Sequence, residues 1–142
     1  MVETAAQRVL PCPAQALYEL LGDVASYPAY MPGWVAARVL RRDGDTAQVR
    51  QTVRVLGRSW DFDSVARFEP PQRLSIRAGA PFGEFELRWE LRALSPSSTR
   101  VSAALRASLG DPLLDALARR ALPLLLRRTV AALESRALQR CA

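Results

Sequence analysis

Apolar and polar residues alternate through the middle of the chain, and towards its end the spacing becomes helical. The alternation over residues 46–109 predicts strands with one buried and one solvated face, which is typical of an antiparallel sheet. In the clearest segment, 82–94, one face carries Phe85, Leu87, Trp89, Leu91 and Ala93. Over residues 111–142, apolar side chains recur three and four positions apart. This spacing predicts one long helix whose apolar face is formed by Leu113, Leu114, Leu117, Ala121, Leu124 and Leu125.

Breaks in these patterns define the order of the elements. We expect a strand at 3–10, short helices at 14–21 and 24–30, strands at 34–42, 46–56, 59–68, 73–78, 82–94 and 99–109, and then the long helix. Asp111 and Pro112 favour a helix start, and Pro123 predicts a bend within the helix. The chain therefore predicts a single α+β domain, 1–142, with two short helices after the first strand. Its curved seven-stranded antiparallel sheet would wrap around the C-terminal helix.

One helix cannot fill the concave face of a seven-stranded sheet, so a cavity is expected between the two. The small inward residues Ala103 and Ala107 of the last strand would make room for it. We expect the residues at inward positions of the strands and of the helix to form the wall of this cavity and to contact an apolar ligand. This wall would comprise Tyr30, Trp34, Gln51, Val53, Trp60, Phe62, Ser64, Phe85, Leu87, Trp89, Leu117, Ala121 and Leu125.

Several of these residues have a purely structural alternative. Gln51 and Ser64 are polar and inward, so they either bond to each other or to a trapped water, or they orient a ligand oxygen. The aromatic residues serve as core as well as cavity wall. Tyr30 either gates an entrance or, together with Tyr27, holds the short helices. Arg128 is expected to face solvent because Pro123 disturbs the helical phase, although a place at the cavity mouth stays open.

The basic residues restrict the possible chemistry. All twenty are arginines, and the chain contains no histidine. An imidazole base, a Ser-His-Asp triad and a Schiff-base lysine are therefore excluded, and no catalytic residue or cofactor is predicted. Cys12 and Cys141 have no histidine partners, which excludes a zinc site. We expect free thiols, although the sequence is compatible with a disulfide.

The net charge of +6 allows weak association with a membrane surface. The arginines are spread along the whole chain, which argues against dedicated nucleic-acid binding. No apolar run approaches the roughly 20 residues of a membrane span, and residues 1–8 lack the layout of a signal peptide. The sequence therefore predicts a cytoplasmic protein.

Three segments resemble the SRPBCC (START-like) superfamily, nearest to its coenzyme Q-binding and polyketide cyclase/dehydrase branch. Residues 17–34, LYELLGDVASYPAYMPGW, are similar to the family's helix-turn segment, with its Asp-Val and Tyr-Pro landmarks. Residues 81–91, PFGEFELRWEL, resemble its Pro-Phe…Trp strand, and 130–137, VAALESRA, the end of its last helix. The resemblance implies a helix-grip fold with a hydrophobic tunnel between sheet and helix.

These observations favour a binding module that holds a quinone, lipid or polyketide-like molecule by shape and apolar contact. One alternative is a polyketide cyclase/dehydratase of the same fold, which would need a titratable group in the cavity. The other is an interaction protein of the ribosome or RNA that uses the arginine-rich helix surface. The sequence decides neither the identity of the ligand nor the oligomeric state.

Overall fold

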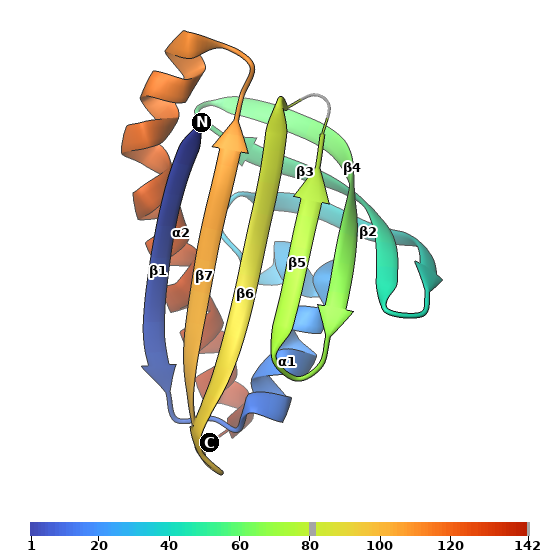
Figure 1. The fold of residues 1–142 in the computed structure, drawn as a ribbon, viewed down its shortest axis with the longest axis vertical. Coiled ribbons are helices and arrows are strands. Elements are labelled where there is room, and N and C mark those ends of the chain that lie inside the picture. The colour runs from blue at the N-terminus through green and yellow to red at the C-terminus, as the bar shows by residue number, and fades with distance from the viewer. Residues whose placement is uncertain (80–81, 142) are drawn as a thin grey trace.

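The computed structural model describes residues 1–79 and 82–141, so residues 80, 81 and 142 lie outside it, including Pro81 of the segment 81–91. A seven-stranded antiparallel sheet, ordered β1-β7-β6-β5-β4-β3-β2, curves around one long helix (Figure 1). The predicted α+β helix-grip architecture is confirmed. Its elements are β1 (Val2–Leu10), α1 (Ala14–Gly22), η1 (Val24–Ala29), β2 (Trp34–Asp43), β3 (Thr46–Val55), β4 (Arg58–Glu69), β5 (Arg73–Ala78), β6 (Glu84–Ser95), β7 (Ser98–Ser108) and α2 (Pro112–Cys141).

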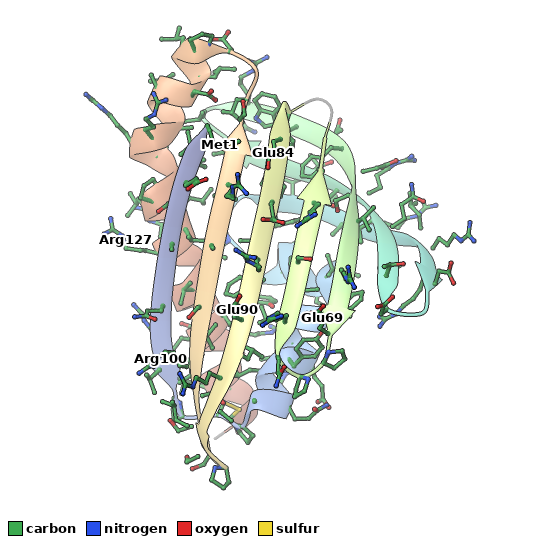
Figure 2. The ribbon with its side chains drawn as sticks, in the orientation of Figure 1. Met1, Glu69, Glu84, Glu90, Arg100 and Arg127 are labelled. Atoms are coloured by element: carbon green, nitrogen blue, oxygen red, sulfur yellow. A yellow bond between two sulfur atoms is a disulfide. The ribbon has the colours of Figure 1, made fainter. Side chains whose placement is uncertain are left out.

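The alternation in the sequence separates the two faces of the sheet. On β4, the inward residues are all buried: Trp60, Phe62, Ser64, Ala66 and Phe68. Charged side chains project from the other face, as Figure 2 shows for Glu84 and Glu90. There they form cross-strand ion pairs such as Arg50–Asp63 and Arg106–Glu3. Because the outer face is solvated, apolar and polar residues alternate strictly along the strands, which makes the strands easy to recognise in the sequence.

The two short helices lie between β1 and β2. The second is a 3₁₀ helix that contains Pro28, a residue without the N–H that a longer α-helix would need there. Tyr27 is fully buried, and its hydroxyl donates a hydrogen bond to the Leu21 carbonyl at 2.5 Å. This contact ties η1 to α1, which confirms the structural interpretation for Tyr27.

The long helix begins where the sequence predicts. The Asp111 Oδ1 accepts hydrogen bonds from the backbone N–H groups of Leu113, at 2.8 Å, and Leu114, at 3.4 Å, as an N-cap does. The helix continues through Pro123 to Cys141, and the bend at Pro123 stays a prediction.

The predicted apolar face of this helix is wrong for Leu113, Leu117 and Leu124, whereas Leu114 and Leu125 do pack against the core. Leu113, Leu117 and Leu124 are 69%, 48% and 44% exposed. The side chains that pack on the sheet are instead Ala118, Leu122, Leu126, Thr129, Val130, Leu133 and Ala137. Because leucines and alanines occur on more than one side of this helix, their spacing alone does not select the buried side. The small residues Ala118 and Ala137 are fully covered, and the large leucines between them fill the space under the sheet.

The expectation of free thiols is also wrong. Cys12 and Cys141 form a disulfide across a sequence separation of 129 residues, with their Cα atoms 5.7 Å apart. Cys12 follows β1 directly, and α2 runs back along β1, where Arg8 pairs with Glu134 at 2.9 Å. The tertiary fold therefore brings the two ends of the chain together, which the spacing of the cysteines could not reveal.

Candidate ligand pocket

An apolar pocket lies between α2 and the inner faces of β3, β6 and β7. Its cavity volume is about 80 Å³. The residues that line it are Pro32, Gly33, Trp34, Val53, Arg54, Val55, Leu56, Phe82, Phe85, Leu87, Leu105, Ala107, Leu109, Leu122, Leu125, Leu126 and Thr129. Of these residues only Arg54 is charged, and the Thr129 hydroxyl already donates to the Leu125 carbonyl at 2.9 Å. The wall can therefore recognise apolar surface and offers little polar recognition.

Gly33 shapes one side of the pocket. The Arg54 N–H donates a hydrogen bond to the Gly33 carbonyl at 2.7 Å, which holds the chain before β2 against the end of β3. Gly33 has a φ of 83°, and a Cβ there would lie 3.2 Å from the Arg54 carbonyl oxygen and 3.9 Å from Leu125 Cδ1. The close approach of the two segments therefore requires glycine at this position.

We expect Gly33→Ala to lower the free energy of unfolding by about 1–3 kcal/mol, because an L-residue is strained at this φ and its Cβ meets backbone. Urea denaturation measures the change. The matched control is Gly22→Ala, whose Cβ would meet no neighbour closer than 3.9 Å. Equal losses for the two variants would contradict a special role for Gly33.

Four aromatic rings cluster beside the pocket, and two of them, Phe82 and Phe85, line it. Phe82 lies at their centre, with ring centroids 4.8 Å from Phe62, 5.1 Å from Trp60 and 5.5 Å from Phe85. Phe82 is only 6% exposed, although the alternation of 82–94 places it opposite Phe85. The reason is that β6 begins at Glu84, so Phe82 belongs to the preceding turn and is free to point inward.

Gln51 and Ser64 lie outside the residues that line the pocket. The Ser64 hydroxyl donates to Gln51 Oε1 at 2.5 Å, and the two residues are 1% and 2% exposed. The interpretation that they bond to each other is confirmed. Gln51 Nε2, Trp60 Nε1 and Trp89 Nε1 are buried without a partner among the described residues. The inner sides of β3, β4 and β6 thus each carry one buried donor that has no acceptor in the described part of the chain.

We expect Ser64→Ala to lower the free energy of unfolding by about 1–3 kcal/mol, because it leaves Gln51 buried without its donor. Chemical denaturation measures this loss. Ser59→Ala, at an exposed position of the same strand, serves as the control and should change little. A loss of ligand affinity with unchanged stability would instead assign Ser64 to the ligand.

The structure brings together only part of the predicted wall. Trp34, Val53, Phe85, Leu87 and Leu125 line the pocket, and Trp60 and Phe62 lie behind Phe82. Trp89 is buried away from the pocket, and Tyr30 packs under Arg136, 5.3 Å from its ring centroid. Leu117 and Ala121 do not line it either, because the helix turns them away. Sequence reasoning missed Leu105, Leu109, Leu122 and Leu126, whose inward alternation or helical spacing could have shown them once the phase of α2 was known.

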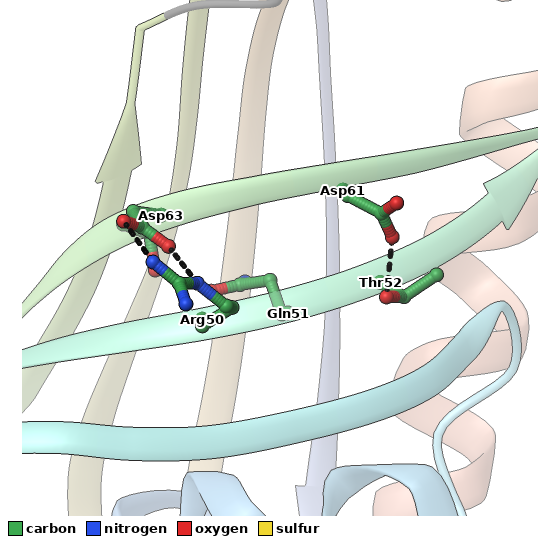
Figure 3. Close-up of polar contacts among 6 residues, drawn as sticks. Arg50, Gln51, Thr52, Asp61 and Asp63 are labelled. Carbon is green, nitrogen blue, oxygen red and sulfur yellow. Dashed lines mark hydrogen bonds and ion pairs between the residues drawn. The ribbon is translucent and has the colours of Figure 1, made fainter.

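The carboxylates of β4 and the tyrosines of the short-helix segment are engaged outside the pocket. Figure 3 shows Asp63 paired with Arg50 and Asp61 accepting a hydrogen bond from Thr52, both on the outer side of β3 and β4. The Arg50 hydrogen bond lowers the pKa of Asp63. Burial raises the pKa values of Tyr27 and Tyr30, so both hydroxyls stay protonated near neutral pH. In the described part of the chain, no three His, Cys, Asp or Glu side chains are grouped to hold a metal ion.

Residues 10–134 match the model of a protein family described as polyketide cyclase / dehydrase and lipid transport. The chain belongs to this family. It is 28% identical over 109 residues to the ribosome association toxin RatA of Pseudomonas aeruginosa, and the match covers 76% of both chains. The polyketide cyclase / dehydrase and lipid transport family thus includes this chain as a START-like member, as the sequence resemblance implies.

Solved structures support the fold. The protein TTHA0849 from Thermus thermophilus superposes with a TM-score of 0.87 at 21% identity, and the match covers 99% of both chains. A START superfamily protein from Mycobacterium smegmatis superposes with a TM-score of 0.85 at 21% identity, covering 96% of this chain and 97% of its own. Membership of the polyketide cyclase / dehydrase and lipid transport family implies a hydrophobic ligand.

Proposed function

We propose that the protein binds a quinone, lipid or polyketide-like molecule by enclosing an apolar part of it in this pocket, without chemical turnover. The observation that supports the proposal is the composition of the lining, in which aliphatic and aromatic side chains surround the void and Arg54 is the one charged residue among the described residues. Apolar enclosure with few polar groups is typical of small-molecule sites.

The size of the cavity refines the proposal. A volume of about 80 Å³ is smaller than the roughly 150 Å³ of a cavity that holds benzene. The pocket as it stands therefore fits the end of an alkyl or prenyl chain. Arg54 is exposed and alternates with the inward Val53 and Val55, so its side chain projects to the outer side of β3. Proton transfer has no support here, since a guanidinium keeps its proton at neutral pH.

Native mass spectrometry of protein purified from its own host tests the proposal. We expect a bound apolar molecule that is released on denaturation. Protein emptied in this way and refolded should show a change in tryptophan fluorescence, to which Trp34 in the pocket wall contributes, when it binds a decyl-chain benzoquinone or decanoic acid. An empty native protein that responds to neither probe would refute ligand binding, and conversion of a poly-β-ketone would favour the cyclase.

Ribosome association is a second candidate, favoured by the likeness to a ribosome association toxin and by exposed arginines on α2. Salt-dependent sedimentation with ribosomes would support it. In the described chain, no helix is both long and apolar enough to cross a membrane. A cytoplasmic location stays a prediction. Cytosolic thiols are kept reduced. A disulfide between Cys12 and Cys141 in the host would therefore argue against a cytoplasmic location, and reduced thiols would agree with it.

A further inference from the structure

The outward side of α2 exposes leucines that the fold leaves without a partner. Leu113 is 69% exposed, Leu117 48% and Leu124 44%. Together with Arg120 and Arg127 they recur three and four residues apart, so all five side chains lie along one stripe of the helix. We call these five residues the outer stripe of α2. Large apolar side chains grouped on one exposed face mark an interaction surface more often than single exposed ones do.

The charge around this stripe is positive. Arg119, Arg120, Arg127 and Arg128 are exposed, and Figure 2 shows Arg127 projecting from α2 into solvent. Within residues 1–79 and 82–141, none of the four is in an ion pair. A surface that combines leucines with unpaired arginines is complementary to an apolar layer beneath an anionic one.

The acidic residues of the same helix do not neutralise these arginines. Asp115 accepts a hydrogen bond from the Leu109 N–H at 2.8 Å, and its side chain is 14% exposed. Glu134 pairs with Arg8 of β1. Both carboxylates are therefore engaged by groups outside the four arginines, and the outer side of α2 keeps an excess of positive charge.

The stripe also lies next to the ligand pocket. Leu124 belongs to the stripe, whereas the neighbouring residues Leu122, Leu125 and Leu126 line the pocket. One segment of α2 thus presents apolar residues both to the interior and to the outside. A surface that bound the stripe would lie within one helix diameter of the pocket.

We propose that the outer stripe of α2 docks on an anionic lipid bilayer. The leucines enter the boundary between headgroups and acyl chains, and the arginines bind lipid phosphates. Amphipathic helices with leucine on one face and arginine beside it bind membranes in this way. Nearby basic residues add to the attraction of an anionic surface. RNA would use the arginines but would leave the leucines in water, which makes a bilayer the better match.

Vesicle sedimentation of the full chain tests the docking. We expect binding to phosphatidylcholine vesicles that contain a quarter phosphatidylglycerol, and at least about tenfold weaker binding to phosphatidylcholine alone. The triple variant Leu113→Ser, Leu117→Ser, Leu124→Ser should lose about tenfold or more in affinity, and so should Arg120→Gln with Arg127→Gln. Leu113→Ser alone changes the most exposed leucine and should give a smaller loss of vesicle affinity. This single variant replaces the triple variant if the latter does not fold.

Matched controls separate docking from general charge and hydrophobicity. Leu94→Ser removes a leucine that is 47% exposed on β6, and Arg92→Gln with Arg100→Gln removes two arginines from exposed positions of β6 and β7. Both controls should bind vesicles within about twofold of the natural protein. Equal losses in controls and stripe variants would overturn the proposal. Retained vesicle binding by the leucine variants, RNA retention that needs only the arginines, or a dimer that the leucine variants abolish would also overturn it.

The docking does not depend on ligand binding. A variant whose pocket is filled should still bind anionic vesicles, so failure of the pocket proposal and failure of the docking proposal give different results. Vesicle binding that is lost on filling the pocket, with the stripe intact, would show that the bilayer contacts the pocket and would refute docking through the stripe.

Discussion

Ala107→Leu should abolish the binding of apolar probes while leaving the fold intact. Ala107 lines the pocket from β7 and is 2% exposed, so three added carbon atoms would enter the void of about 80 Å³. We expect at least about a tenfold loss of affinity for a decyl-chain benzoquinone, because the substituted side chain occupies the ligand's place. The free energy of unfolding should stay constant or rise by up to about 2 kcal/mol, because the void is filled with apolar atoms.

Ligand titration by tryptophan fluorescence and urea denaturation measure the two effects. Ala104→Leu adds the same atoms on the opposite face of β7 and should leave affinity unchanged. Unchanged affinity in Ala107→Leu would place the ligand elsewhere. A large loss of stability would instead mean that the void is too small to accept the added atoms.

Removing the disulfide should give the largest loss of stability. Cys12→Ala with Cys141→Ala frees a loop of more than a hundred residues in the unfolded chain. Such a cross-link is worth typically 2–4 kcal/mol through the entropy of the unfolded state, and we expect a loss of about that size. Guanidinium denaturation without reductant measures it.

A reductant provides the matched experiment. The natural protein treated with dithiothreitol should lose about as much stability as the double variant, and the double variant should not respond. If the natural protein were equally stable with and without reductant, the link between β1 and α2 would contribute nothing, and the ion pair of Arg8 with Glu134 would hold the helix end.

The helix shows the limit of periodicity as evidence. The spacing of its leucines predicts a helix and a buried face, and the helix is present, but the buried side is the one that carries Ala118, Leu122 and Leu126. Residues such as Leu113 and Leu124 satisfy the same spacing on another side. The choice between the two sides depends on which one fits the curved sheet. The shape of that sheet is set by the strands and not by the sequence of the helix.

The residues that line the pocket show a second limit of predicting the site from sequence patterns. The alternation correctly places Val53, Phe85 and Leu87 on the inner side, and all three line the pocket. Trp89 has the same alternation and is buried elsewhere, because the inner side of a long strand spans both the pocket and the solid core. Phe82 is outside the strand, so its inward direction depends on the turn that precedes β6.

The order of the elements, the antiparallel sheet, the helix start at Asp111 and the solvated outer face could all be predicted from the sequence. These features depend on local backbone preferences and on the alternation of apolar and polar neighbours. Both can be recognised within short segments of the sequence. The buried side of α2, the pairing of Cys12 with Cys141 and the small volume of the pocket became known only from the folded structure. Each of these depends on contacts between residues far apart in the chain, whose distances are fixed only when the sheet curves around the helix.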